Sequence, residues 1–329
     1  MTHRYSLATK VGCVLLLFYC LLLKISFLRD FHKTSIYNSS GHKVSLADFT
    51  PSYRYTMLPN LSLCHDSREN KPLMVVTVLS VASHSELRRA IRESWASAKN
   101  SDSIKTGHVV VFFILSSPSS IYEVYKVQKE QFKYNDLIVT DLPETYEDLF
   151  LKVYATLVFH QQYCHSARFL MKVDEDIAVH LDRMLESWTI DDQASSSLFC
   201  HLLRKTPRIT DSHHKWYVPD SVWPEPYFPT YCMGGLYVMG KEAGQLILDY
   251  ARIFPPLIIE DLFYTGIVAE IADVQRIDWR GNIIWKDFWR RKRLPCNGSE
   301  PVLFAVHSLP SPGQMRKGFR RLKDYDCTR

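Results

Sequence analysis

The chain of 329 residues carries almost no net charge once its first 33 residues are set aside. The formal charge is 40 − 35 = +5, and residues 1–33 alone contribute 5 − 1 = +4. A nucleic-acid-binding domain is expected to have a basic face of its own, so the nearly neutral remainder argues against that class. Internal repeats and low-complexity tracts are also missing. With 46% apolar and 23% charged residues, the composition excludes a wholly disordered, collagen-like or coiled-coil protein and predicts one large globular domain.

The cysteines lack the spacing of a zinc site, because neither a C-x-x-C nor an H-x-x-x-H pair occurs. Outside the N-terminal apolar run there are six of them: Cys64, Cys164, Cys200, Cys232, Cys296 and Cys327. In an oxidising compartment this even number allows three disulfides, and the sequence does not choose between the alternative pairings. We therefore expect structural cysteines.

Residues 11–28 form an apolar stretch that only Lys24 interrupts. A membrane span needs about 20 residues, and Lys24 can extend its ammonium group to the interface. A cleaved signal peptide would need a small-residue cleavage site after the run, and none follows. An uncleaved anchor needs only the run with basic residues before it, which Arg4 and Lys10 supply. We predict a cytoplasmic tail at 1–10, a transmembrane signal anchor at 11–28 and a lumenal remainder.

Three Asn-X-Ser motifs agree with a lumenal location, because they are acceptors for N-linked glycans on exposed surfaces. They begin at Asn38, Asn60 and Asn297, all outside the apolar run. Residues 29–70 are polar and lack sustained periodicity, which is typical of a stem between the anchor and a folded domain. The catalytic domain is then expected over residues 71–329.

Apolar runs and helical patterns alternate from residue 72 onward. Near-continuous apolar runs are typical of strands buried on both faces, and they lie at 73–81, 108–116, 136–142 and 167–176. Helical spacing follows the first three runs, at 84–96, 120–133 and 146–163. This alternation predicts an α/β fold with a mostly parallel, doubly wound sheet. After about residue 195 prolines break the pattern, and helices are expected again at 240–253 and 260–271.

An acidic triplet, Asp174-Glu175-Asp176, comes directly after the fourth apolar run. Ligands bind at the carboxyl ends of strands in open α/β sheets, and carboxylates there can hold a divalent cation that neutralises a diphosphate. A charged turn after a strand is the structural alternative. The pair Gly234-Gly235 also stands out in a chain with only 12 glycines, and it predicts a tight turn or a close approach of a ligand to the backbone.

Five motifs occur in a fixed order along the chain. They are Arg88-Arg89-Ala90-Ile91-Arg92-Glu93-Ser94-Trp95, the run from Tyr146 to Lys152, the run from Phe169 to Asp176, the run from Tyr227 to Tyr237, and Ile259-Glu260-Asp261-Leu262. In this order and spacing they resemble the β-1,3-glycosyltransferase family, whose members use UDP-galactose or UDP-N-acetylglucosamine. The resemblance covers roughly residues 73–310. It implies a GT-A-like nucleotide-sugar-binding fold in a Golgi type II membrane enzyme.

Five positions depart from the family's motifs. The triplet is Asp-Glu-Asp instead of three aspartates, and both outer aspartates are kept. Asp148 and Phe150 replace the usual Asn and Thr, Leu236 replaces a common glycine, and Leu262 replaces valine. These departures bear on substrate preference more than on the type of reaction.

The resemblance also implies a role for individual residues. Asp176 resembles the carboxylate that binds Mn²⁺, and His307 the distant histidine that completes the metal site. Asp174 resembles the aspartate that contacts the donor sugar or ribose. Asp261 resembles the catalytic base, with Glu260 placed to orient Asp261 or the acceptor. The remaining candidates for donor binding are Arg88, Arg92, Gly234 and Gly235, and the structural alternative for the two arginines is a solvated helix face.

The chemistry of inverting transfer agrees with these roles. One carboxylate must take the proton of the acceptor hydroxyl, and a cation rather than an acid must stabilise the leaving UDP. We expect galactose transfer from UDP-galactose to the 3-hydroxyl of a glycan on a glycoprotein or glycolipid, by an enzyme that also contacts the membrane and forms homo-oligomers. The alternatives are transfer of N-acetylglucosamine or N-acetylgalactosamine, a catalytically silent lumenal sugar-binding or chaperone module, and a metal-dependent hydrolase. A hydrolase would need a water-activating site with more clustered histidines than the chain shows.

Overall fold

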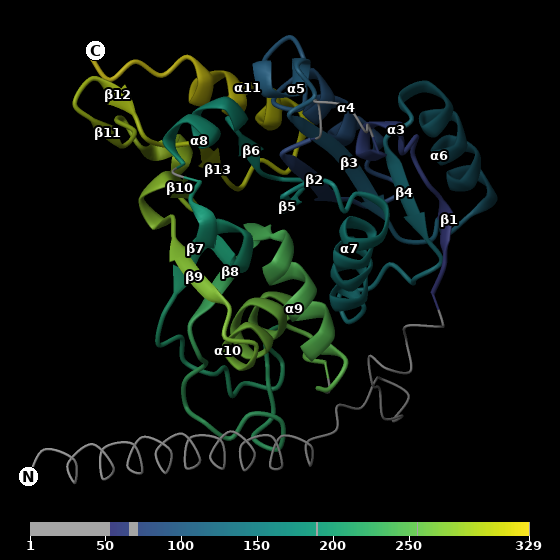
Figure 1. Ribbon diagram of the computed structural model, residues 1–329, viewed down its shortest axis with the longest axis vertical. Helices are drawn as coiled ribbons and strands as arrows, with labels where there is room; N and C mark the ends of the chain where they lie inside the picture. Colours follow the sequence, from purple (N-terminus) through teal and green to yellow (C-terminus); the bar gives the residue numbers. More distant parts are fainter. Residues whose placement is uncertain (1–52, 66–71, 189, 255, 329) are drawn as a thin grey trace, which may run out of the picture.

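The computed structural model describes residues 53–65, 72–188, 190–254 and 256–328 (Figure 1). The predicted tail and anchor, and Asn38, lie outside these residues. Within the described ranges no helix has the length and apolar character needed to cross a bilayer.

The first half of the domain is built from the predicted strands and helices. Parallel strands lie in the order β4 (Leu137–Thr140), β3 (Val109–Leu115), β2 (Met74–Leu79) and β5 (Phe169–Asp174). The connecting helices are α4 (Ser85–Glu93), α6 (Ile121–Tyr134) and α7 (Leu149–Tyr163). Successive β2 side chains enter two different cores, Val75 on the α7 face and Val76 on the α4 face. The apolar runs are continuous because both faces of these strands are covered.

The second half of the sheet runs differently from the prediction. Strand β8 (Tyr231–Gly240) is antiparallel to β5, β7 (Ser197–Leu203) is antiparallel to β8, and β9 (Gln275–Asp278) is parallel to β7. The eight-stranded sheet is therefore mixed rather than mostly parallel. Residues 204–230 join β7 to β8 without a helix, and a parallel return would need a crossover that this proline-rich segment does not form.

The sheet begins upstream of the expected boundary at residue 71. Strand β1 (Tyr55–Met57) pairs antiparallel with β4 at the sheet edge, and α3 (Ser62–His65) follows it. Tyr55 donates a hydrogen bond to the Ala155 carbonyl (2.6 Å), and Cys64 forms a disulfide with Cys164. Part of the segment assigned to the stem thus belongs to the folded domain. Strand β1 has only three residues, so its alternation of more and less buried side chains is too short to be recognised in the sequence.

Smaller elements complete the domain. A three-stranded sheet contains β10 (Ile283–Ile284), β13 (Ala305–Val306) and β6 (Ala178–Val179), in that order. The expected helix at 260–271 is a π-helix, Leu262–Val268, that continues into α10 (Ala269–Ile271), and the other late helices are α9 (Lys241–Ala251) and α11 (Pro312–Lys323). The short elements are α5 (Asp102–Lys105), α8 (Leu181–Ser187), β11 (Cys296–Asn297), β12 (Glu300–Pro301) and the 3-10 turns Asp192–Ser196, Arg280–Asn282 and Phe288–Arg290.

Candidate active site

The candidate site lies where the strand order reverses, between β2 and β5. Leu79 at the end of β2 is in register with Asp174 at the end of β5, so the two carboxyl ends are adjacent. A reversal of this kind leaves a crevice at the sheet edge, which is where open α/β sheets bind ligands. The acidic triplet begins at this point, as the sequence predicted.

Asp176 and His307 come together although 131 positions separate them in the chain. Strand β13 pairs with β6, and the Leu309 amide donates to the Asp176 carbonyl (2.9 Å). These contacts bring His307 Nε2 to 3.2 Å from Asp176 Oδ2, with both side chains 30% exposed. The burial of His307 opposes protonation, but its hydrogen bond to Asp176 and that residue's charge raise the pKa of the imidazole.

The second ring nitrogen of His307 contacts the Trp285 carbonyl, Nδ1 to O at 3.0 Å. A histidine that donates Nδ1–H to a carbonyl presents the lone pair of Nε2, which is the usual arrangement of a metal-ligating histidine. The carboxylate and this nitrogen therefore fit a divalent cation. The described part of the chain contains no cluster of three or more His, Cys, Asp or Glu suited to a metal. A cation here would have two protein ligands, with substrate and water oxygens as the others.

Asp174 is held by a buried lysine that the sequence analysis did not identify. Lys172 Nζ lies 2.9 Å from Asp174 Oδ1 and 2.8 Å from Glu260 Oε1, and it donates to the Gly234 carbonyl (2.5 Å). Burial alone would lower the pKa of Lys172, but the two carboxylates outweigh it and raise that pKa above its usual value. The sequence did contain a signal for this role, since Lys172 is a charged residue inside the apolar run FLMKV. A buried ammonium group requires acidic or carbonyl partners.

Glu260 does not reach solvent as a catalytic group would. It is buried, and its second oxygen accepts a hydrogen bond from the Tyr237 hydroxyl (3.1 Å). Both carboxylate oxygens are thus occupied by residues of the core, Lys172 and Tyr237. This burial excludes direct contact of Glu260 with the acceptor, while its charge acts on the neighbouring Asp261. The orienting role of Glu260 toward Asp261 stays a prediction.

Asp261 is partly exposed and stands at the start of the π-helix. Its Oδ1 accepts a hydrogen bond from the Leu262 amide (2.8 Å). Burial and the charge of Glu260 raise the pKa of Asp261 to about 7, against a smaller opposing effect of backbone hydrogen bonds from Leu262 and Gly234 and of the Lys172 charge. A carboxylate with a pKa near neutrality is suited to accept and release a proton at physiological pH.

The two glycines of β8 face opposite sides of the sheet. A methyl group on Gly234 would lie 2.8 Å from Asp261 Oδ2, and one on Gly235 would lie 2.5 Å from the Trp285 ring. The pair lies inside a strand, so the predicted tight turn is wrong. The groups that approach it are side chains of the same chain, and the approach of a ligand stays a prediction. Gly234 leaves room for Asp261, and Gly235 leaves room for Trp285.

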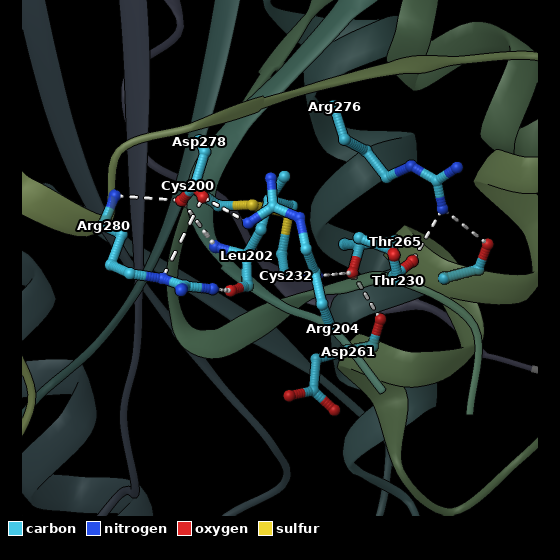
Figure 2. Close-up of a disulfide and its surroundings, with 11 residues drawn as sticks. Cys200, Leu202, Arg204, Thr230, Cys232, Asp261, Thr265, Arg276, Asp278 and Arg280 are labelled. Atoms are coloured by element: carbon cyan, nitrogen blue, oxygen red, sulfur yellow. Dashed lines mark hydrogen bonds and ion pairs between the residues drawn. A yellow bond between two sulfur atoms is a disulfide. The ribbon is translucent and has the colours of Figure 1, made fainter. Parts of the chain in front are cut away.

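A disulfide supports the position of Asp261 (Figure 2). Cys200 on β7 is bonded to Cys232 on β8, next to an irregularity in the register of these strands. The Cys232 amide donates to Thr265 Oγ1 (2.9 Å), and the Thr265 hydroxyl donates to the Asp261 carbonyl (2.6 Å). Strand β8 and the π-helix are therefore fixed to one another beside Asp261. The third disulfide, Cys296–Cys327, ties the C-terminal segment to β11, and all six expected cysteines are paired.

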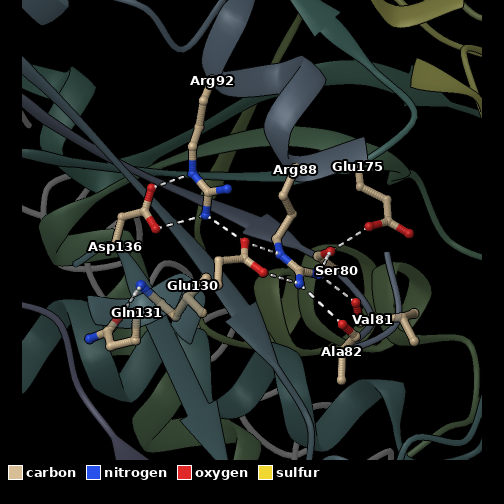
Figure 3. Close-up of polar contacts among 10 residues, drawn as sticks. Ser80, Val81, Ala82, Arg88, Arg92, Glu130, Gln131, Asp136 and Glu175 are labelled. Atoms are coloured by element: carbon tan, nitrogen blue, oxygen red, sulfur yellow. Dashed lines mark hydrogen bonds and ion pairs between the residues drawn. The ribbon is translucent and has the colours of Figure 1, made fainter. Parts of the chain in front are cut away.

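The two arginines of α4 are paired with acidic side chains of the same chain (Figure 3). Arg88 is fully buried and binds Glu130 through Nε and Nη2 (2.8 and 2.7 Å). It also donates to Ser80 Oγ and to the carbonyls of Val81 and Ala82. Arg88 therefore holds the β2–α4 loop through hydrogen bonds to Ser80, Val81 and Ala82. The prediction that Arg88 contacts a nucleotide directly is wrong, because its side chain is fully buried.

Arg92 takes part in the same network. It binds Asp136 through Nε and Nη2 and Glu130 through Nη2, at 2.7 to 2.8 Å, and its side chain is 11% exposed. The alternative prediction, that both arginines lie on a solvated helix face, is wrong because both side chains are largely or fully buried. Glu175, the middle residue of the triplet, contacts the same loop through Ser80 Oγ (2.5 Å) and His84.

Two of the three predicted glycosylation sites lie in the described residues. Asn60 and Asn297 are both exposed, and Asn297 is in the short strand β11.

Comparison with known proteins agrees with this geometry. The galactosyltransferase family model matches residues 86–280, which is more than half of the chain. Beta-1,3-galactosyltransferase 5 of Gorilla gorilla gorilla is 26% identical over 262 residues, covering 79% of this chain and 84% of that protein. Lactosylceramide 1,3-N-acetyl-beta-D-glucosaminyltransferase of Xenopus tropicalis is 28% identical over 230 residues, covering 68% and 59%.

Similarity to solved structures is more remote. Apo mouse xyloside xylosyltransferase 1 matches with a TM-score of 0.38 and 12% identity, covering 73% of this chain and 100% of that one. The assignment rests on the family match and on the sequence relatives: the chain belongs to the galactosyltransferase family and is a glycosyltransferase.

Proposed function

We propose that the protein is an inverting β-1,3-galactosyltransferase of the GT-A type, which transfers galactose from UDP-galactose to the 3-hydroxyl of an acceptor glycan. The observation that carries this proposal is Asp261, a partly exposed carboxylate with a pKa of about 7. Lys172 joins its neighbour Glu260 to Asp174 at the end of β5. In this proposal the base and the donor site lie on two sides of one buried ammonium group, that of Lys172.

The reaction follows from these positions. Ionised Asp261 takes the proton of the acceptor hydroxyl as that oxygen attacks the anomeric carbon of the donor. The bond between that carbon and the β-phosphate oxygen breaks, and UDP leaves with the bonding electron pair. Attack from the side opposite UDP inverts the configuration. Lys172 and Glu260 do not react in this scheme, because their contacts hold Asp174 and Asp261 in position.

Asp176 and His307 would hold the metal, for which we propose Mn²⁺. When bound, this cation would neutralise charge on the diphosphate of the leaving UDP. The chain's own contribution is to aim an Asp oxygen and an imidazole nitrogen at one point, fixed by the Leu309 amide and the Trp285 carbonyl.

The test is release of UDP by the purified full-length protein with simple β-glycoside acceptors. UDP-galactose, UDP-N-acetylglucosamine and UDP-N-acetylgalactosamine are compared with and without Mn²⁺. We expect release with UDP-galactose that depends on Mn²⁺ and is lost in Asp176→Ala and Asp261→Asn. Asp249→Asn, an exposed carboxylate on α9, is the matched control. Preference for another donor would assign the corresponding transferase, and absence of release and of UDP-sugar binding would favour a silent module.

The cellular context is proposed on the sequence alone. An uncleaved anchor at 11–28 would place the domain in the Golgi lumen, on a type II membrane protein. The three disulfides agree with an oxidising compartment. Immunofluorescence and protease protection of the tagged full-length protein test this topology, and digestion of a C-terminal tag without detergent would contradict it.

A further inference from the structure

Two basic segments of the C-terminal region meet at one cleft. Residues 286–293 follow β10, and residues 312–326 comprise α11 and the three positions after it. Together the two segments carry ten basic and three acidic side chains, a net charge of +7. Residues 34–329 as a whole carry only +1, because +4 of the formal +5 lies in residues 1–33. The fold therefore concentrates positive charge in these two segments of a domain whose other residues are net negative.

The cleft between the two segments has a volume of about 490 Å³. Its lining has four basic side chains and two carboxylates, and consists of Lys292, Lys317, Arg320, Arg321, Asp324, Tyr325 and Asp326. Lys292, Lys317 and Arg320 are exposed, and their side chains form no ion pair or hydrogen bond within the described part of the chain. Three cationic groups of the lining are thus available to an anion from outside.

Contacts between the two segments fix the walls of the cleft. Arg321 donates to the carbonyls of Phe288 (2.7 Å) and Arg291, and its guanidinium carbon lies 4.6 Å from the centre of the Phe288 ring. The Leu294 amide donates to the Tyr325 hydroxyl (2.9 Å), and the third disulfide joins the same two parts of the chain. The cations of both segments are held together although their mutual repulsion opposes this.

We propose that this cleft binds a sulfated or carboxylated polysaccharide. Lysine and arginine side chains form charge-assisted hydrogen bonds with sulfate and carboxylate groups, and a cleft lined by one sign of charge raises the local concentration of the opposite ion. The cleft volume lies within the roughly 300–1,000 Å³ of ordinary ligand sites, which is enough for a short stretch of such a chain.

Two properties of the domain favour a polysaccharide over other polyanions. The three disulfides indicate an oxidising compartment, where acidic polysaccharides rather than nucleic acids are the polymers at hand. A cleft between a loop and a helix admits a linear chain, whereas a flat bilayer surface would meet only its rim. None of the lining residues belongs to the candidate active site, so this inference stands apart from the proposed transfer reaction.

Binding of a heparin hexasaccharide to the purified full-length protein tests the cleft. We expect isothermal titration calorimetry to show binding that weakens as NaCl is raised from about 0.05 M to about 0.2 M, because salt screens exposed charges. The neutral maltohexaose should not bind. The double variant Lys317→Ala/Arg320→Ala should raise the Kd about tenfold, because two exposed ion pairs with the ligand are lost. Lys292→Ala, in the other segment, should raise it about threefold.

The double variant Lys126→Ala/Lys129→Ala is the matched control, since it removes two exposed cations with the same spacing from α6. Its Kd should equal that of the wild-type protein. Equal weakening by both double variants would show that the hexasaccharide responds to net charge alone, and would overturn the cleft. Absence of hexasaccharide binding, or tighter binding of a short-chain phosphatidylserine or of a hexanucleotide, would also overturn it. Asp261→Asn should bind the hexasaccharide normally, so the result does not depend on sugar transfer.

Discussion

The Asp261 carboxylate lies directly against the backbone of Gly234. A methyl group at Gly234 would come to 2.8 Å from Asp261 Oδ2 and 3.1 Å from its Cβ. The Gly234 carbonyl accepts a hydrogen bond from Lys172 Nζ (2.5 Å). Gly234 on β8 therefore constrains the positions of both the Asp261 carboxylate and the Lys172 ammonium group.

Substitution of Gly234 by alanine should displace the base. The added methyl group must move Asp261, and a shift of about 1 Å in a reacting group costs roughly a hundredfold in rate. We expect Gly234→Ala to lower kcat by about that factor while the circular-dichroism spectrum stays native. Gly313→Ala is the control, because a methyl group there meets nothing within 4 Å. Equal kcat values for the two variants would contradict the placement of Asp261.

The pKa of Asp261 predicts the acid limb of the pH–rate profile. The transfer step needs the ionised carboxylate, so kcat/KM should rise with pH and level off above about 7. An ordinary aspartate would give a limb near 4. Glu260→Gln removes a charge that raises this pKa, so the limb should move to lower pH. A limb near 4 in the wild-type protein, measured at saturating Mn²⁺, would exclude Asp261 as the base.

The same raised pKa makes a prediction for stability. The unfolded chain ionises Asp261 near 3.8 and the folded chain near 7, so the unfolded state releases its proton first and stability falls between these pH values. The shift corresponds to roughly 4 kcal/mol at most. Asp261→Asn removes this cost but also one backbone hydrogen bond, so we expect a net gain of about 1–3 kcal/mol at pH 8.

Urea unfolding of Asp261→Asn and wild-type protein at pH 5 and pH 8 measures this difference. The variant's advantage should be larger at pH 8. A constant difference at both pH values would show that Asp261 titrates normally in the folded protein.

Local pattern was enough to predict the parallel half of the sheet, because strands buried on both faces leave continuous apolar runs. It also located the acidic triplet that begins with Asp174, whereas the role of Asp261 came from the family resemblance. The link between Asp176 and His307 came from family resemblance, since the β6–β13 pairing that joins them involves only two residues on each strand. Such pairings leave no periodic signal.

The buried charges were harder to predict. Arg88 was predicted to bind the donor, with a solvated helix face as the alternative, and neither foresees its burial against Glu130, which is 42 positions away. Lys172 had a local signal, but its partner Glu260 is 88 positions away. Strand β8 is antiparallel to β7 because residues 204–230, which connect them, contain no crossover helix. The irregular sequence of these residues did not predict the direction of β8. Tertiary partners decide each of these features.

The arginine network under the β2–α4 loop gives the last prediction. Arg88 makes five side-chain hydrogen bonds, to both Glu130 oxygens, Ser80 Oγ and two loop carbonyls. Lysine has one ammonium group and cannot replace the planar fork, so Arg88→Lys should leave Glu130 and the carbonyls underpaired and cost about 2–4 kcal/mol of unfolding free energy. Arg89→Lys, on the same helix with a 48% exposed side chain, should cost less than about 0.5 kcal/mol. Chemical denaturation of the two variants measures both values. Because the loop lies at the end of β2, Arg88→Lys should also raise the KM for the UDP-sugar; similar stabilities and KM values for the two variants would show that the network does not hold the loop.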